Sequence, residues 1–281
     1  MGINVIKGAG HQFGTHKQQS KTFHANQVDT RKFSSIQDVQ NALKEQGLES
    51  SNLIIGIDYT ESNEWSGVKT FGGYGLHRIR NGILNPYQEV ITIIARTLEA
   101  FDDDKIVPVY GFGDSATTDK SVFPFWKERI PPGFEHIVER YNAITPDIKC
   151  AGPTNFAPII WQAIRITKAS KSFHILIIIA DGDVIDLQET SDAIVDASSF
   201  PLSIIMVGVG DGPWEMMRRF DEGLPARKFD NFKFVPFHEV LSGQENREIA
   251  FSAAALAELP YQFKEIQRLG LLTNLQSNMD Y

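Results

Sequence analysis

Three side chains that carry oxygen atoms stand at alternate positions directly after a short apolar run. Asp58, Thr60 and Ser62 follow residues 53–57, whose sequence Leu-Ile-Ile-Gly-Ile fits a strand buried on both faces. Alternate spacing in an extended or looped segment can aim all three side chains at one point. A carboxylate with two hydroxyl groups is an all-oxygen set, which suits a hard divalent cation. The chemistry that these residues predict is therefore metal binding.

Two later segments supply further oxygen donors. Thr154 leads into a helical pattern, and Asp181 ends a second apolar run at residues 174–180. Ligands bind at the carboxyl ends of the strands in parallel α/β sheets, so both segments are expected beside Asp58. Two buried carboxylates at one spot repel each other strongly unless a cation or protons lie between them. We predict that one magnesium or manganese ion, with calcium as a further candidate, is bound by five residues: Asp58, Thr60, Ser62, Thr154 and Asp181.

The elements that must position these donors alternate along the chain. Apolar stretches predict strands, and a periodicity near 3.6 residues with capping residues predicts helices. The expected strands are residues 53–57, 106–112, 174–180, 202–209 and a short edge strand at 232–237 that contains Pro236. The expected helices are residues 35–46, 86–101, 134–144, 154–167, 189–198 and 247–268, the last broken at Pro260. This alternation predicts a doubly wound, mostly parallel α/β sheet with helices on both faces.

Two long connections are predicted to be loops. Residues 63–87 are rich in Gly and Asn and follow the Asp58 motif directly, so we expect them to fold over or beside the site. His77 in this loop is interpreted as a packed or solvated histidine in preference to a metal ligand. Residues 123–132 form an aromatic and proline-rich loop. Asp114, at the end of the second expected strand, is a further candidate carboxylate for the binding face.

Composition and net charge narrow the classes of protein to which this chain can belong. The 281 residues are 42% hydrophobic and 22% charged, as in ordinary globular proteins. A net charge of −8 argues against general nucleic-acid binding, and no apolar run approaches the roughly 18 residues of a membrane span. We expect a flexible tail at residues 1–34, one domain at 35–270 and a frayed end at 271–281. Cytoplasmic localisation is expected, with peripheral membrane contact and nuclear localisation left open.

Catalytic interpretations have less support in the residues. One cysteine, Cys150, does not suffice for a cysteine zinc cluster or a RING finger. A phosphoesterase of the haloacid-dehalogenase type would need a second Asp two positions after Asp58, where the sequence has Thr60. The glycine-rich turns at 111–113 and 208–213 match no nucleotide-binding motif. We therefore expect a binding protein and not an enzyme. A metal-dependent phosphoesterase and a scaffold with a structural metal stay open as alternatives.

Several segments together resemble a known family. They read N-L-I-I-G-I-D-Y-T-x-S-N-E-W-S-G, N-P-Y-Q-E-V-I, Y-G-F-G-D, G-P-T-N-F-A-P-I-I, I-I-A-D-G, P-L-S-I-I-M-V-G-V-G-D-G-P-W-E-M-M and F-D-N-F-K-F-V. Over about residues 35–270, the chain resembles the copine-type von Willebrand factor A domain. It is most similar to the version found in the RGLG family of ubiquitin ligases.

The resemblance implies a six-stranded, Rossmann-like sheet whose short edge strand is antiparallel. It also implies that the five predicted residues form a metal-ion-dependent adhesion site, in which hydroxyl groups bind the ion directly and the Asp residues bind directly or through water. The implied function is metal-dependent protein binding by an adaptor, with a partner that supplies an Asp or Glu to the metal.

A substrate-recognition role in ubiquitin ligation is the alternative that the resemblance suggests. Copines normally carry two C2 domains and the ligases carry a RING finger, and this chain contains neither. We therefore do not carry over calcium-dependent membrane binding or ubiquitin transfer.

Overall fold

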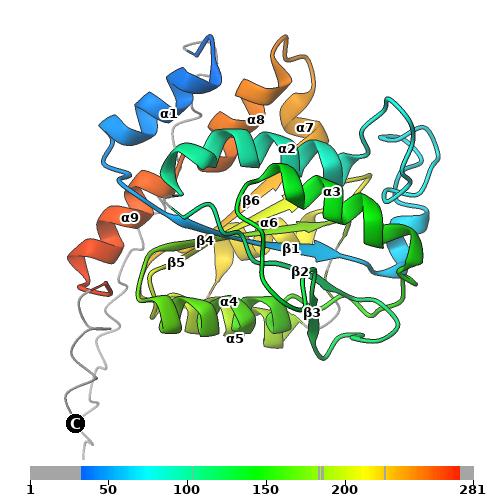
Figure 1. The fold of residues 1–281 in the computed structure, drawn as a ribbon. Helices are drawn as coiled ribbons and strands as arrows, with labels where there is room; N and C mark the ends of the chain where they lie inside the picture. Colours follow the sequence, from blue (N-terminus) through cyan, green and yellow to red (C-terminus); the bar gives the residue numbers. More distant parts are fainter. Residues whose placement is uncertain (1–32, 103, 183, 185–186, 225, 273–281) are drawn as a thin grey trace, which may run out of the picture.

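A computed structural model describes residues 33–272 of the protein, apart from residues 103, 183, 185–186 and 225. Its centre is a six-stranded sheet in the order β3-β2-β1-β4-β5-β6 (Figure 1). All neighbouring strands are parallel except β2 and β3, which are antiparallel. The strands are β1 (Asn52–Asp58), β2 (Val109–Phe112), β3 (Val122–Pro124), β4 (His174–Ala180), β5 (Leu202–Gly208) and β6 (Phe232–Pro236). The predicted mostly parallel α/β sheet of six strands is confirmed.

Helices cover both faces of this sheet, as a doubly wound fold requires (Figure 1). One face packs against α1 (Ile36–Glu45), α2 (Pro86–Leu98), α3 (Glu135–Ile144), α7 (Phe237–Leu241), α8 (Arg247–Leu256) and α9 (Leu259–Arg268). The other face packs against α4 (Ala157–Ser170), α5 (Leu187–Ala197) and α6 (Glu215–Gly223). Short 3-10 helices are η2 (Glu61–Glu64), η3 (Glu99–Phe101) and η4 (Thr145–Asp147).

The two helical layers explain why the central strands are continuously apolar. Successive side chains of a strand point to opposite faces. In β4, Ile175, Ile177 and Ile179 join the core beneath α1 and α2. Leu176 and Ile178 join the core beneath α4 and α5. Both faces exclude water, so a buried parallel strand has no polar positions that would show as an alternation in the sequence.

The pairing of β1 with β4 brings two carboxylates to one edge of the sheet. The strands are parallel neighbours, and Ile57 lies opposite Ile179. Asp58 ends β1, and Asp181 directly follows β4. The carboxyl ends of the two central strands therefore place both Asp residues at the edge where ligands bind in open α/β sheets.

The edge strands differ from the expectation. The predicted strand at 232–237 is β6, but it runs parallel to β5. The antiparallel edge strand is β3 (Val122–Pro124), which lies largely within a stretch predicted to be a loop. Three residues ending in a proline leave almost no periodic signal, and Pro124 is tolerated because it lies in an edge strand. The assignment of the antiparallel edge to residues 232–237 was therefore wrong.

Other predicted boundaries are close to those observed. The helix expected from Thr154 begins at Ala157, and the one expected at 247–268 is split into α8 and α9, with Pro260 in the first turn of α9. Most of the predicted tail at 1–34 and of the predicted frayed end at 271–281 lies outside the described residues. No helix within the described part of the chain combines the length and the apolar character that crossing a membrane requires.

Candidate metal centre

Asp58 and Asp181 form the buried floor of the predicted site. Their exposed fractions are 0% and 1%. In each carboxylate, the atom Oδ2 is buried and has no hydrogen-bond partner among the described residues. An unpartnered buried oxygen is costly, and two of them on neighbouring anions are more so. This is the observation that a bound cation would explain.

The other carboxylate oxygens are held by the turn that follows β1. The backbone N–H of Thr60 donates to Asp58 Oδ1 at 2.8 Å, and the Ser62 hydroxyl donates to Asp181 Oδ1 at 2.9 Å. The Thr60 and Ser62 hydroxyl oxygens lie 3.1 Å apart. Four of the five predicted residues are therefore joined in one hydrogen-bonded group. The 3-10 helix η2 makes this possible because it turns Ser62 back toward β4.

Electrostatics disfavours two ionised carboxylates at this place. Burial raises the pKa of Asp58 well above its usual range, and the charge of Asp181 raises it further. Burial also raises the pKa of Asp181, while the neighbouring Ser66 and Ser62 hydroxyl groups lower it. Oxygen donors of this kind, with hydroxyl groups beside carboxylates, fit a hard cation such as magnesium. No group of three or more His, Cys, Asp or Glu that could hold a metal ion occurs within the described residues, so the hydroxyl groups are essential to this assignment.

Thr154, the fifth predicted residue, approaches from the segment before α4. Ala151 pairs with Thr60 as an isolated bridge, and its N–H donates to the Tyr59 carbonyl at 3.1 Å. This pairing lays the segment beside the end of β1. Thr154 is 8% exposed, and its hydroxyl makes no hydrogen bond with another described residue. No hydrogen bond joins the Thr154 side chain to the other four described residues, so its membership of the site stays a prediction.

Asn63 is a member of this group that the sequence analysis did not single out. Its side-chain N–H groups point to the Thr60 carbonyl at 3.1 Å and to Asp181 Oδ1 at 3.3 Å. The Tyr87 hydroxyl donates to Asn63 Oδ1 at 2.6 Å. Asn63 therefore ties the turn after β1 to the end of β4. Its position directly after the Asp-x-Thr-x-Ser motif was the available signal.

His77 anchors the long loop to the backbone of β1. Its Nε2 lies 2.7 Å from the Asp58 carbonyl, which can only accept, so Nε2 carries the proton. The Tyr141 hydroxyl then donates to Nδ1 at 2.8 Å. The ring stacks on Tyr59 and Tyr87, with centroids 4.5 and 4.1 Å apart. Burial lowers the pKa of His77 to about 4, so the imidazole is neutral. This supports the interpretation as a packed histidine.

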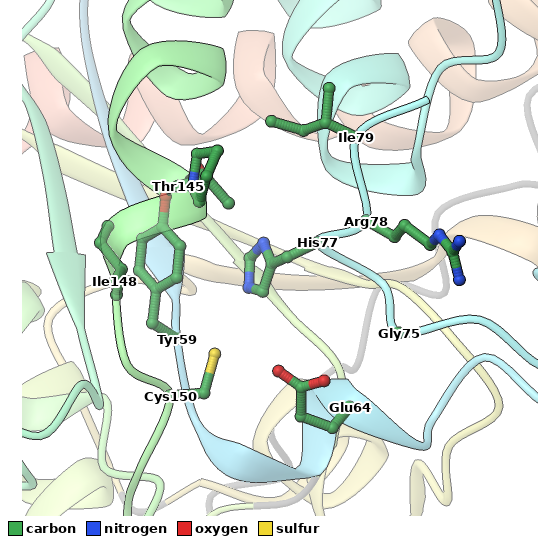
Figure 2. Close-up of a pocket in the computed structure, with 10 residues that line it drawn as sticks. Tyr59, Glu64, Gly75, His77, Arg78, Ile79, Thr145, Ile148 and Cys150 are labelled. Carbon is green, nitrogen blue, oxygen red and sulfur yellow. Dashed lines mark hydrogen bonds between the residues drawn. The ribbon is translucent and has the colours of Figure 1, made fainter. Parts of the chain in front are cut away.

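A pocket of about 420 Å³ opens beside this histidine (Figure 2). Figure 2 shows the His77 ring beside Tyr59, while the Arg78 side chain points away from both. The Tyr59 hydroxyl pairs with Thr145 at 2.8 Å. Cys150 also lines this pocket, and burial raises the pKa of its thiol to about 12. The thiol is therefore protonated at neutral pH and has little nucleophilic or metal-binding character.

We expect His77→Phe to destabilise the protein by about 1–3 kcal/mol, because the buried Asp58 carbonyl and Tyr141 hydroxyl each lose a hydrogen bond while ring stacking is kept. Manganese affinity should fall by about tenfold, as is usual when a group that orients a ligand is lost. Urea unfolding and calorimetry would measure the two effects. His136→Phe, at an exposed histidine on α3, is the matched control, and equal stability of the two variants would contradict the anchoring role.

The loop has a second attachment at the end of β5. Asp211 Oδ2 accepts the Lys69 N–H at 2.9 Å, and Asp211 Oδ1 accepts the Thr70 N–H at 2.9 Å and its hydroxyl at 2.7 Å. The predicted loop therefore lies beside the site, as expected, and it is fixed at two points.

The turn after β2 supports the site from the side of Thr60. Gly113 adopts φ +82, and a Cβ atom at this position would lie 2.5 Å from Thr60 Cγ2. Asp114 was a candidate for the binding face, but its carboxylate accepts the Thr117 N–H at 2.9 Å and also the Thr117 hydroxyl. Asp114 therefore closes its own turn, while Gly113 gives Thr60 the room that it needs.

Comparison with known proteins decides the family. The family model described as Copine matches residues 75–275, which is most of the chain. The chain belongs to the copine family. The matched range includes Thr154 and Asp181 and begins after the Asp58 motif. The copine-type resemblance drawn from the sequence motifs is thereby confirmed.

Two relatives and one solved structure illustrate the similarity of this copine chain. "E3 ubiquitin-protein ligase RGLG1" of Arabidopsis thaliana is 51% identical over 257 residues, covering 85% of this chain and 52% of that protein. "Copine family protein 2" of Caenorhabditis elegans is 50% identical over 244 residues, covering 85% of this chain and 3% of that protein. The structure of a von Willebrand factor type A protein from Catenulispora acidiphila aligns with a TM-score of 0.43 and 13% identity, over 78% of this chain and 43% of that one.

These relatives overturn the expectation that the protein is not an enzyme. Several proteins 46–51% identical to this copine chain are named E3 ubiquitin-protein ligases. The expectation rested on finding one cysteine and no catalytic constellation in 281 residues. The chain spans about half the length of the RGLG1 and RGLG2 ligases that it matches, so its own cysteine count does not decide the matter.

Proposed function

We propose that this copine chain is a protein-binding module that depends on a bound magnesium or manganese ion, with calcium as a further candidate. Asp58, Thr60, Ser62, Thr154 and Asp181 would hold the ion. The observation that carries the proposal is the pair of buried carboxylates, Asp58 and Asp181, each with an unpartnered Oδ2 atom. When bound, the cation supplies positive charge that offsets both burial and mutual repulsion.

The residues of the chain have separate tasks in this proposal. Asp58 and Asp181 supply the negative charge, and the hydroxyl groups of Thr60, Ser62 and Thr154 supply neutral oxygen donors. Asn63 and Ser62 orient Asp181 through its Oδ1 atom. Because only two of the five proposed ligands carry a negative charge, a partner Asp or Glu can gain a charge-assisted contact with the ion.

The loop beside the site supports protein recognition. Residues 65–84 expose several large apolar side chains: Trp65 at 58%, Val68 at 64%, Ile83 at 46% and Leu84 at 50%. Apolar side chains gathered on one connection near a polar site are typical of an interaction surface. A partner segment that carries a carboxylate and apolar neighbours would match the site and the loop together.

Partner binding is expected to be lost in EDTA and restored by magnesium or manganese. Immobilised wild type and Thr154→Ala would be incubated with cell lysate with and without EDTA, and retained proteins quantified by mass spectrometry. Partners of the metal site should be proteins that the wild type retains in the presence of metal and loses in EDTA. Thr154→Ala should not retain them in the presence of metal. For one such partner, replacing a single acidic residue of that partner should abolish binding. The metal should raise the affinity of the chain for the partner, and the partner should raise its affinity for the metal by the same factor.

A partner that binds equally well in EDTA, and equally well to Thr154→Ala, would place recognition on another face. The metal would then have a structural role in a scaffold. Ser115→Ala, an exposed hydroxyl position at the end of the β2 turn, serves as the matched control for Thr154→Ala.

The names of the ligase relatives favour a second role, recognition of substrates within ubiquitin ligation. In cells, a partner captured through the metal site should then gain ubiquitin when the wild-type chain is expressed, and not when Asp58→Asn is expressed. Equal ubiquitination with both chains would speak against this role. The single, half-buried cysteine suits a reducing compartment, so we propose the cytoplasm as the site of action.

A further inference from the structure

A groove lies between helix α4 and the edge hairpin formed by β2 and β3, which pack side by side (Figure 1). Its volume is about 610 Å³. One wall is a stripe along α4 that includes Trp161, Arg165 and Lys168, at the spacing of neighbouring turns. The other wall consists of the hairpin residues Val122 and Pro124. None of the five predicted metal ligands lines this groove.

The groove is positively charged although the protein is acidic. Lys120, Arg165 and Lys168 line it, and none of the described Asp or Glu residues does, in a chain whose net charge is −8. All three cations are exposed, and none forms an ion pair with a described residue. Arg165 donates to Gln162, and Lys168 lies 4.5 Å from the Phe200 ring centroid, so neither meets a compensating carboxylate there. These three positive charges are therefore available to bind an anionic ligand.

The free edge of the sheet adds a second kind of binding group. β3 is the last strand in the order, and Phe125 N–H donates to the Val109 carbonyl across the β2–β3 pair. Backbone groups alternate in direction along a strand, so those of Val122 and Pro124 point away from β2. Val122 thus offers an N–H and a carbonyl, and Pro124 offers a carbonyl, along an edge that no described strand pairs with.

We infer that this groove binds an acidic peptide segment of a partner protein in an extended conformation. Its backbone pairs with β3, its carboxylates meet Lys120, Arg165 and Lys168, and an apolar side chain packs on Trp161, which is 37% exposed. A peptide is favoured over a nucleic acid because only a peptide offers alternating backbone donors and acceptors to a strand edge. Since the groove contains none of the predicted metal ligands, this binding does not depend on metal.

Fluorescence anisotropy with a labelled peptide of alternating Glu and Val tests the inference, with a length of about seven residues to match a short strand. The double variant Arg165→Glu with Lys168→Glu should weaken binding by at least about tenfold, since it replaces attraction by repulsion at two contacts. The matched control reverses two charges beneath the opposite face of the sheet, Lys44→Glu with Lys264→Glu, and should change the affinity by less than about twofold. EDTA should have no effect.

Two further probes decide between the kinds of ligand. The same peptide with methylated backbone nitrogens keeps its charges and should bind much more weakly, because it cannot pair with β3. Equal binding of the methylated peptide, or equal loss with both double variants, would overturn the proposal. Oligothymidylate that binds as tightly as the peptide, and is lost in the Arg165→Glu/Lys168→Glu variant, would show a nucleic-acid groove in its place. Unchanged melting temperatures would confirm that the variants fold.

Discussion

Replacing Asp58 by Asn is expected to abolish binding of magnesium or manganese and to stabilise the protein when metal is absent. The amide keeps the shape of the side chain and removes its charge. A group that only orients a ligand is commonly worth about 10–100-fold in metal affinity, so the loss of a charged donor should exceed that range. Calorimetric titration with manganese would measure the first effect, and thermal unfolding in EDTA would measure the second.

The gain in stability follows from the direction of the pKa shift. Burial, and then the charge of Asp181, raise the folded-state pKa of Asp58 above its unfolded value near 3.8. The stability that this group contributes is complete below the unfolded pKa and is lost as the pH rises through the folded pKa. At neutral pH without metal, burying the Asp58 carboxyl group beside Asp181 therefore weakens the fold, and Asn at position 58 removes that cost.

Asp114→Asn is the matched control, because Asp114 lies close by and closes the turn after β2. It should leave manganese affinity unchanged and lower stability slightly through the weakened turn. Equal manganese affinity of Asp58→Asn and the wild type would refute the assignment of the metal site.

Gly113→Ala is expected to destabilise the protein by about 2–4 kcal/mol, from a strained backbone and a steric overlap together. The backbone at Gly113 has φ +82, and the added Cβ would lie 2.5 Å from Thr60 Cγ2 and 3.1 Å from the Thr60 nitrogen. Relief requires Thr60 to move, so manganese affinity should fall as well. Urea unfolding and manganese titration would measure both.

Two comparison variants separate these causes. Gly82→Ala has a similar backbone, φ +75, with no atom within 4 Å of its Cβ, so it measures the cost of the backbone alone. Thr60→Ser keeps the hydroxyl and removes the methyl group that the new Cβ meets. The double variant Gly113→Ala/Thr60→Ser should therefore recover part of the lost stability and metal affinity. If Gly113→Ala cost no more than Gly82→Ala, the proposed contact with Thr60 would be wrong.

The parts of the fold that could be predicted are those where burial leaves a periodic or continuous apolar pattern. The runs at 53–57, 174–180 and 202–209 became β1, β4 and β5 with boundaries within one or two residues. β3 could not be predicted, because three edge residues with a proline carry too little hydrophobic pattern to differ from a loop. The helix predicted from Thr154 begins three residues later, at Ala157, whose N–H is accepted by the Asn155 side chain.

Part of the candidate site could be predicted because the carboxyl ends of parallel strands meet at one edge of the sheet, where ligands bind. Asp58 and Asp181 are each placed by a strand end, and Thr60 and Ser62 by their spacing from Asp58. The roles of Asn63 and His77 depend on contacts across the fold. His77 lies 19 positions from the carbonyl that it binds, and no local pattern encodes that distance. The metal itself stays a prediction of the donor set.

The two attachments of the long loop change what its length implies. A free connection of some twenty residues would lose considerable conformational entropy when a partner ordered it. Here Asp211 holds Lys69 and Thr70, and His77 holds the Asp58 carbonyl, so that loss occurs when the chain folds. A partner that binds as proposed would meet a preorganised surface, and its contacts with Trp65 and Val68 would contribute to affinity without the cost of ordering the loop.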